Sequence, residues 1–324
     1  MTSGTYPFEA VRDHLTELYS RLSTARDVHH RRELLDEFFL VDPSCTTLIE
    51  GTSVTPVVAD GIESRWVVAP GCDTANRLLY IHGGSWCSGN TAAYQYVCSH
   101  ISESTGCAVL AIDYKLAPEY KYPEGLNDCV KAYNWLCKNG PEGEAVCKSV
   151  FISGDSAGGN LTLATYLRLR AQEKDGHAIR KPNGLMPVSA VTDWTQQGES
   201  FKSRAAVDPI LQEASLPKLH PVYGIGEFAG PAVDSKLGLK DPCVSPLFGD
   251  YSQSPPLFIM VGDYEVLLDD SVVLAKMAKE QGADVQIKVY NKGVHVFIGF
   301  APYLPEAVEA IQDMGEFVRK HQSA

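Results

Sequence analysis

The segment Val150–Asn160, VFISGDSAGGN, decides the fold that we expect for this chain. Its first residues have the composition of a short buried strand, and the residues after Ser156 continue as a helix, AGGNLTLATYLRLRAQE. The junction GDSAG matches G-x-S-x-G, which places a serine on a sharp turn between a strand and a helix. The sequence therefore predicts Ser156 as a nucleophile above a sheet. The alternative is a glycine-rich turn with a capping serine, but the chain has neither G-x-G-x-x-G nor a lysine-bearing phosphate loop.

Short apolar runs alternate with helical segments on both sides of this turn. The expected strands are CAVLAIDY, SVFISGDS, GLMPVSAV, PPLFIMVG and VQIKVY, and the expected helices include GLNDCVKAYNWLCKNG, SVVLAKMAKEQG and PEAVEAIQDMGEFVRKH. Almost wholly apolar strands that alternate with helices indicate a mostly parallel sheet covered on both faces. Before them, TTLIEGTSVTPVVAD and ESRWVVAPG predict an antiparallel hairpin at the edge of the sheet.

Two stretches do not follow the alternation. Residues 6–41 predict two helices ahead of the sheet, and residues 196–238 contain no strand candidate although they lie between two expected strands. An insertion at that position commonly covers the carboxyl ends of the strands. We therefore expect one α/β domain over residues 1–324, with a helical cap formed by residues 1–45 and about 196–238.

Composition excludes several classes of function. The net charge of −12 argues against nucleic acid as a partner, and no apolar stretch approaches the ~20 residues that cross a membrane. The N-terminus has no secretory pattern, and the nine cysteines show no metal spacing. We expect a cytoplasmic protein with reduced thiols, no metal and no other cofactor.

A nucleophilic serine needs a histidine and an acid, here in the order serine, acid, histidine. Only His295 and His321 follow PPLFIMVG, and His321 lies near the C-terminus on a polar helix end, so His295 is the expected base. Glu265 is modestly favoured as the acid over Asp263, which could form the turn after the strand. Asp269 and Asp270 read as the charged first turn of the next helix.

Taken together, these motifs resemble the hormone-sensitive-lipase-like esterases of the α/β-hydrolase superfamily. The resemblance runs from about residue 47 to the end and rests on HGGSW, Asp113–Glu119 (DYKLAPE), GDSAGGN, DPCVSPLFGD and VGDYEVLLDDS. It implies an α/β-hydrolase fold with Ser156 as nucleophile, Glu265 as acid and His295 as base. The chain departs from the common pattern in two places: glutamate replaces the more usual aspartate as acid, and Ser85 replaces the third glycine of the HGGG-type box.

The resemblance also implies a reaction. Ser156 would be acylated and water would hydrolyse the acyl-enzyme, with the oxyanion held by backbone N–H groups of an expected set: Gly83, Gly84, Ser85 and Ala157. Residues expected to contact the substrate are Trp86, Asp155 and Tyr94. The expected substrates are esters with acyl chains of roughly two to eight carbons, or lactones. The family also allows a homodimer.

Three other functions use the same fold. HGGxW also resembles the box of kynurenine formamidase, an amide hydrolase, although DYKLAPE and GDSAGGN fit the esterases better. Non-catalytic receptors such as the gibberellin receptor lose the base histidine, whereas this chain keeps Ser156, Glu265 and His295. Acyl transfer to an acceptor other than water would need the same three residues.

Overall fold

The computed structural model describes residues 8–42, 46–211, 217–225 and 237–323. Its strands are β1 (Ser53–Ala59), β2 (Ile62–Val68), β3 (Asp73–Ile81), β4 (Cys107–Ile112), β5 (Asn139–Gly140), β6 (Gly143–Glu144), β7 (Ser149–Asp155), β8 (Gly184–Val188), β9 (Leu257–Gly262) and β10 (Val285–Tyr290). Its α-helices are α1 (Phe8–Leu22), α2 (Val28–Leu35), α3 (Thr91–Thr105), α4 (Glu124–Leu136), α5 (Ala157–Lys174), α6 (Ser200–Ser203), α7 (His220–Tyr223), α8 (Leu268–Glu280) and α9 (Pro305–His321). None of the helices in these ranges is long and apolar enough to cross a membrane.

Eight strands form one sheet in the order β1-β2-β4-β3-β7-β8-β9-β10. From β4 through β10 every neighbouring pair is parallel, whereas β1 pairs antiparallel with β2, and β2 pairs antiparallel with β4. The expectation of a mostly parallel sheet with an antiparallel hairpin at its edge is confirmed. Strand β7 lies near the middle of the sheet, which places the GDSAG turn at its centre.

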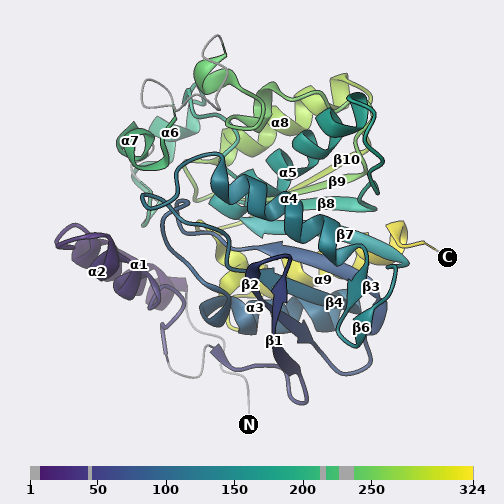
Figure 1. Ribbon diagram of the computed structural model, residues 1–324. Coiled ribbons are helices and arrows are strands. Elements are labelled where there is room, and N and C mark those ends of the chain that lie inside the picture. The colour runs from purple at the N-terminus through teal and green to yellow at the C-terminus, as the bar shows by residue number, and fades with distance from the viewer. Residues whose placement is uncertain (1–7, 43–45, 212–216, 226–236, 324) are drawn as a thin grey trace.

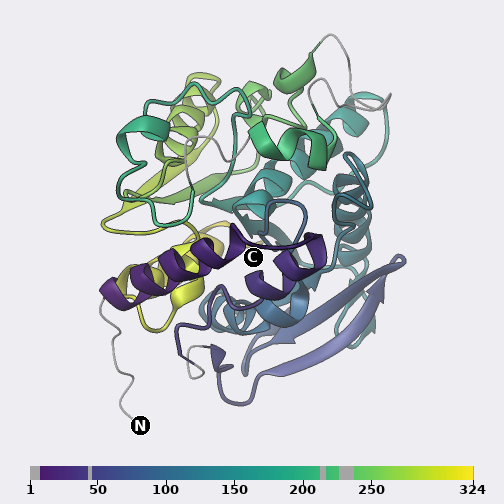
Figure 2. The same cartoon turned by 90° about the vertical axis from the view of Figure 1, so that its left-hand side faces the viewer.

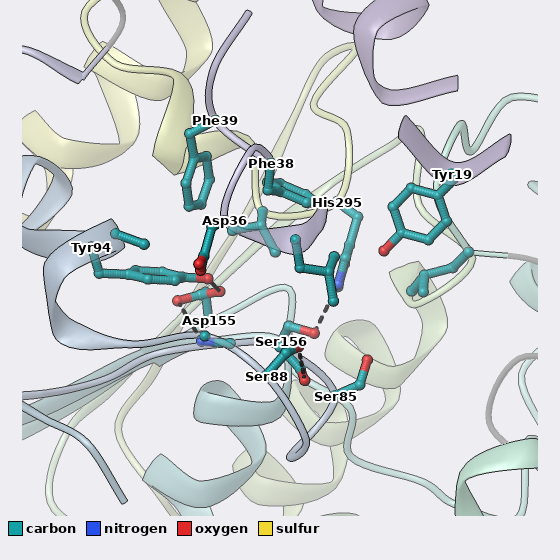
Figure 3. Close-up of a pocket in the computed structure, with 17 residues that line it drawn as sticks. Tyr19, Asp36, Phe38, Phe39, Ser85, Ser88, Tyr94, Asp155, Ser156 and His295 are labelled. Atoms are coloured by element: carbon teal, nitrogen blue, oxygen red, sulfur yellow. Dashed lines mark hydrogen bonds between the residues drawn. The ribbon is translucent and has the colours of Figure 1, made fainter. Parts of the chain in front are cut away.

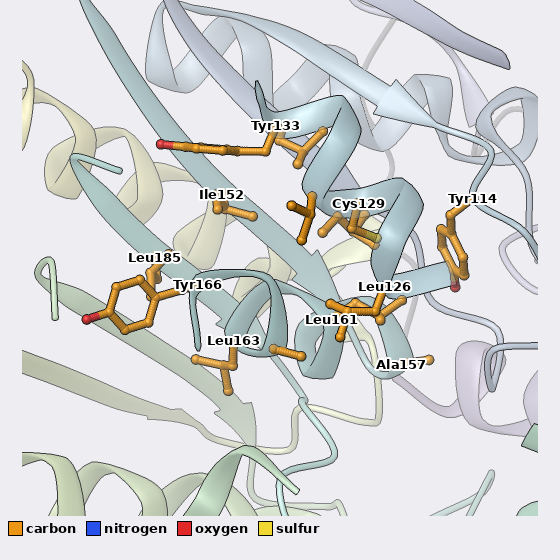
Figure 4. Close-up of a cluster of buried hydrophobic side chains, with 14 of the residues drawn as sticks. Tyr114, Leu126, Cys129, Tyr133, Ile152, Ala157, Leu161, Leu163, Tyr166 and Leu185 are labelled. Carbon is orange, nitrogen blue, oxygen red and sulfur yellow. The ribbon is translucent and has the colours of Figure 1, made fainter. Parts of the chain in front are cut away.

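Both faces of the sheet are buried, and this explains why its strands are so uniformly apolar. In β4, Leu110 and Ile112 pack into one cluster of core residues, whereas the alternate residues Val109 and Ala111 pack into the other. Helices α4, α5 and α8 cover the first face, and α3 and α9 cover the second (Figure 1). Figure 4 shows α4 and α5 meeting the sheet through Leu126, Leu161 and their neighbours.

The two stretches expected to form a cap lie on the same side of the molecule. Helices α1 and α2 come from the first, and α6 and α7 from the second, and all four lie to the left in Figure 1. Figure 2 shows α1 crossing the front of the molecule when that side faces the viewer. Residues 1–7, 43–45, 212–216 and 226–236 of the expected cap lie outside the described residues.

All eight cysteines in the described part of the chain are free thiols, and most of them are buried. Cys45, the ninth, lies outside the described residues.

Candidate active site

Ser156 occupies the turn between β7 and α5 in a backbone conformation that a sharp elbow requires. Its φ of 53° and ψ of −117° lie in a region that residues other than glycine rarely adopt. The turn also needs Gly158, because a Cβ there would overlap the carbonyl oxygen of Ile81 on neighbouring β3. The G-x-S-x-G pattern thus lets α5 start close against the sheet with the serine raised above it.

Three residues from different loops form a continuous hydrogen-bonded chain at this turn. His295 Nε2 lies 2.9 Å from Ser156 Oγ (Figure 3). On the other side of the ring, His295 Nδ1 lies 2.9 Å from Glu265 Oε2. All three side chains are buried. A hydroxyl in contact with an imidazole that is itself held by a carboxylate is the arrangement that activates a serine.

Glu265 is fixed by contacts that Asp263 lacks. The other oxygen of Glu265, Oε1, accepts hydrogen bonds from Ser189 Oγ at 2.7 Å and from the Gly262 N–H at 2.6 Å. Asp263 instead accepts a hydrogen bond from the Lys292 N–H, which joins the loop after β9 to the loop after β10. Of the two acids that the sequence left open, the structure brings Glu265 to His295.

Burial and pairing act in opposite directions on the two ionisable partners. Burial lowers the pKa of His295, but the hydrogen bond and charge of Glu265, with the charges of Asp208 and Asp155, outweigh it and the pKa is raised. Burial raises the pKa of Glu265, although its hydrogen bonds from His295 and Ser189 oppose the rise. A histidine with a raised pKa is a stronger base for the Ser156 proton.

The loop after β3, residues 82–90, faces Ser156 in an unusual backbone conformation. We call it the glycine loop. Gly84 has a φ of 120°, and a Cβ there would overlap the carbonyl of Ser88. Ser85 and Trp86 follow with φ values of 56° and 58°, so Ser85 takes up the left-handed conformation that a third glycine would adopt easily.

Three of the four expected oxyanion donors keep their N–H groups available. Within the described residues, the N–H groups of Gly84, Ser85 and Ala157 donate no hydrogen bond to the protein. The Gly83 N–H donates to Asp155 Oδ1 at 3.2 Å. Gly83 therefore supports the loop through Asp155, and the remaining three N–H groups are the ones suited to an anionic oxygen.

Asp155 joins the nucleophile turn to this loop. Its Oδ1 accepts hydrogen bonds from the Tyr80 hydroxyl at 2.8 Å and the Gly83 N–H, and its Oδ2 accepts one from the Tyr94 hydroxyl at 2.9 Å. Burial raises its pKa to about 6, against the effect of the two tyrosine hydroxyls. Asp155 was expected to contact substrate; the structure commits both of its oxygens to the protein at the wall of the pocket.

Two cavities meet at Ser156. The smaller, of about 50 Å³, lies against the glycine loop, His295 and Val296, with Phe38 and Phe39 on its cap side. The larger, of about 650 Å³, opens beyond Ser85 and is lined by α1 and by residues that include Ile210 and Leu219. Both expected cap stretches thus line the space around Ser156.

Trp86 and Tyr94, both expected to contact substrate, line different cavities. Trp86 lines the larger one. The centroid of its ring lies 4.6 Å from the ring centroid of Trp194 and 4.9 Å from that of Tyr223. Tyr94 lines the smaller one, where its ring makes an edge contact with Phe39. Each ring is also part of the packed interior.

The DYKLAPE segment supports the site from behind. Tyr114 stacks on His82 with 4.5 Å between the ring centroids and donates a hydrogen bond to the His82 carbonyl, so it buttresses the loop after β3. Asp113 accepts two hydrogen bonds from Thr91, at the start of α3.

Sequence reasoning missed two residues that hold the surroundings of the site. Arg32 of α2 donates hydrogen bonds to the Cys87 and Ala117 carbonyls and pairs with Glu119 at 2.7 Å, which fastens α2 to the glycine loop. Asp270 is buried and accepts hydrogen bonds from the N–H groups of Thr192 and Asp193, which follow β8. Its role is therefore more than placing a negative charge at the start of α8. A cation in the last turn of a short helix carries no sequence signal for such a distant partner.

The chain resembles known proteins in its sequence. A family model described as alpha/beta hydrolase fold matches residues 78–299. An esterase from Acinetobacter venetianus is 30% identical over 286 residues, which cover 88% of this chain and 87% of the relative. An acetyl-hydrolase from Streptomyces hygroscopicus is 33% identical over 257 residues, which cover 79% of each chain.

Solved structures show the same likeness in three dimensions. The crystal structure of an esterase from the bacterial hormone-sensitive lipase family matches with a TM-score of 0.81 and 31% identity, covering 96% of this chain and 98% of the other. Family model, relatives and structure agree with one another. The chain belongs to the α/β-hydrolase fold family and, within it, to the hormone-sensitive-lipase-like carboxylesterases.

Proposed function

We propose that this carboxylesterase hydrolyses short- to medium-chain esters through Ser156, His295 and Glu265. The observation that carries the proposal is the chain of two 2.9 Å hydrogen bonds from Ser156 through His295 to Glu265. His295 takes the proton of Ser156 Oγ as this oxygen attacks the ester carbonyl, and then returns the proton to the leaving alcohol. Water releases the acyl group by the same steps in reverse, and Glu265 holds the imidazole in the required tautomer throughout.

The oxyanion of each tetrahedral intermediate would rest on the N–H groups of Gly84, Ser85 and Ala157. Main-chain donors require a particular backbone conformation and no particular side chain, since the N–H is common to all residues but proline. Glycine is therefore essential at 84, where the conformation excludes a Cβ, and serine is acceptable at 85.

We expect Gly84→Val to lower kcat at least 10²–10³-fold, the cost of one lost oxyanion donor, because the new side chain would overlap the Ser88 carbonyl and displace the loop. Ser85→Gly is the matched control and should keep kcat within about threefold, since glycine adopts the same conformation at no steric cost. Steady-state hydrolysis of p-nitrophenyl butyrate measures both. A complete loss in Ser85→Gly would instead make the Ser85 hydroxyl a catalytic donor.

We expect Asp155→Leu to destabilise the protein by about 2–4 kcal/mol, because it leaves three buried donors unpaired, and to lower kcat as the glycine loop loses its anchor. Asp155→Asn should keep most of both, since its carbonyl can accept from Tyr80 and Gly83 and the Tyr94 hydroxyl can turn to accept from the amide. Urea denaturation and p-nitrophenyl butyrate hydrolysis give the two readouts. Equal damage in both variants would mean that the negative charge itself matters.

The acyl-chain range of roughly two to eight carbons rests on the size of the larger cavity, which has room for such chains. We also propose that residues 1–45 and about 196–238 act as the cap that closes over it.

A p-nitrophenyl ester series from acetate to palmitate tests the range of acyl-chain lengths, with γ-lactones as a second series and N-formylkynurenine as the amide. Rates that rise steadily to palmitate would contradict the short-chain proposal, and faster turnover of N-formylkynurenine would favour the formamidase function. A homodimer and a cytoplasmic location stay predictions.

A further inference from the structure

The two cavities that meet at Ser156 differ in which half of an ester each can accept. Figure 3 shows Tyr94 and Phe39 on one side of Ser156, and Tyr19 and Ser85 on the other. Of the two cavities, only the smaller is lined by His295. Because His295 protonates the leaving alcohol, the alcohol must leave on the histidine side. The small cavity of about 50 Å³ is therefore the alcohol side, and the cavity of about 650 Å³ is the acyl side.

Polarity changes along the larger cavity. The lining residues Trp86, Val191 and Ile210 are apolar and at most 3% exposed. At the mouth, the lining is exposed or half-buried and includes Arg31 from α2 and Lys218 from the 3₁₀-helix η2 (Pro217–Leu219). An acyl chain that extends from Ser156 would pass from an apolar wall to a cationic rim.

The two cations at this rim have no carboxylate partner in the described part of the chain. Arg32, the neighbour of Arg31, is paired with Glu119, whereas neither Arg31 nor Lys218 takes part in an ion pair there. The described lining of the cavity contains no acidic residue. Asp208 is buried and precedes the lining residue Pro209 in the sequence. Its carboxylate accepts hydrogen bonds from three backbone N–H groups, those of Ile210, Leu211 and Val266.

The charge of Arg31 also reaches the point where the cavities join. Tyr19 lines both cavities, and burial raises the pKa of its hydroxyl while the charge of Arg31 works against that rise and that of Asp208 adds to it. A guanidinium is suited to binding a carboxylate, because its planar donors match the two oxygens.

We propose that the preferred substrates are esters of a small alcohol with an aliphatic dicarboxylic acid, such as monomethyl esters. The methoxy group occupies the small cavity, the methylene chain lies along the apolar wall, and the free carboxylate rests between Arg31 and Lys218. The Ser156 Oγ–acyl bond forms first and gives a tetrahedral intermediate. Its bond to OCH₃ then breaks, methanol leaves with the serine proton, and water then releases the diacid. This proposal rests on the ester hydrolysis proposed above and narrows its substrate.

Monomethyl octanedioate and methyl octanoate form the test pair, since both release methanol. We expect the wild-type protein to hydrolyse the charged ester with a kcat/KM at least equal to that of the neutral one. The ratio of the two kcat/KM values should fall about tenfold in Arg31→Gln/Lys218→Gln, and also in about 0.5 M salt, which screens exposed charges. Lys202→Gln, an exposed cation of α6 outside the cavity, is the control and should keep the wild-type ratio.

The outcomes separate the two proposals. If the wild-type protein hydrolyses methyl octanoate but the double variant keeps the wild-type ratio, the anionic substrate class is wrong and ester hydrolysis stands. An equal fall in Lys202→Gln would likewise overturn it, because the effect would come from the overall charge of the protein. If neither ester is hydrolysed, nor any p-nitrophenyl ester, the proposed function itself fails.

Discussion

Ser156→Ala should lower kcat on p-nitrophenyl butyrate by about 10⁵–10⁶-fold, the loss seen when a serine nucleophile is removed from an intact site. The expected loss is large because the variant lacks the hydroxyl that His295 activates, while the N–H groups of Gly84, Ser85 and Ala157 still polarise the carbonyl and leave a small residual rate. Alanine keeps the Cβ, so the turn between β7 and α5 should keep its shape. We expect the free energy of unfolding to change by about 1 kcal/mol or less.

Covalent labelling decides whether the lost hydroxyl is the nucleophile. Ser85 and Ser88 line the same cavity as Ser156 and are the alternative nucleophiles. A serine-directed phosphonate should label the wild-type protein and Ser85→Gly with one group per chain, and should not label Ser156→Ala. If Ser156→Ala keeps a hundredth or more of the wild-type activity, or is still labelled, the assignment of Ser156 is wrong. A structure of the labelled protein would also show which N–H groups bind the phosphonate oxygen.

The central elements could be predicted from the sequence because their signals are local. The strand VFIS, the turn GDSAG and the following helix are contiguous, and Gly154 and Gly158, two residues to either side of Ser156, leave the space that the sharp turn needs. Helix α9 begins and ends at the residues expected, Pro305 and His321, because a proline starts it and its apolar spacing is regular.

The choice of acid could not be made from local signals. Glu265 and Asp263 lie two residues apart in one loop, and either could follow a strand. What distinguishes them is supplied by other elements: Ser189, after β8, donates to Glu265, and Lys292, after β10, donates to Asp263. Such contacts depend on the packed fold, so the position of Glu265 in the loop favours it only modestly, and the family resemblance supplies the stronger indication.

The loop anchors were hidden for the same reason. Asp155 belongs to the GDSAG motif, so its position suggested a role at the substrate, but its partners Tyr80 and Tyr94 lie far away in the sequence. Arg32 likewise meets Cys87 and Glu119 only in the folded chain. A buried carboxylate with donors on both oxygens becomes visible only once the strands are side by side.

Glu265→Gln should lower kcat about 10⁴-fold, the size of the effect when an amide replaces the acid of a serine–histidine–acid triad. The contacts of Glu265 explain why. Oε1 accepts from both Ser189 and the Gly262 N–H, so the glutamine carbonyl should stay there and its amide N–H should face His295 Nδ1. That nitrogen must then accept, the imidazole proton moves to Nε2, and His295 can no longer take the proton of Ser156.

The pH profile separates this effect from simple damage. His295 must be neutral to act as a base, so kcat/KM falls as the pH drops through its pKa, which Glu265 raises above the ordinary value of 6.5. In Glu265→Gln only burial and the more distant carboxylates remain, so the acidic limb should move to lower pH. Glu265→Asp, the control, keeps the charge but shortens the side chain; it should lose about 10–100-fold in kcat while its acidic limb stays near that of the wild type. An acidic limb that does not move in Glu265→Gln would mean that another group, such as Asp208, sets the pKa of His295.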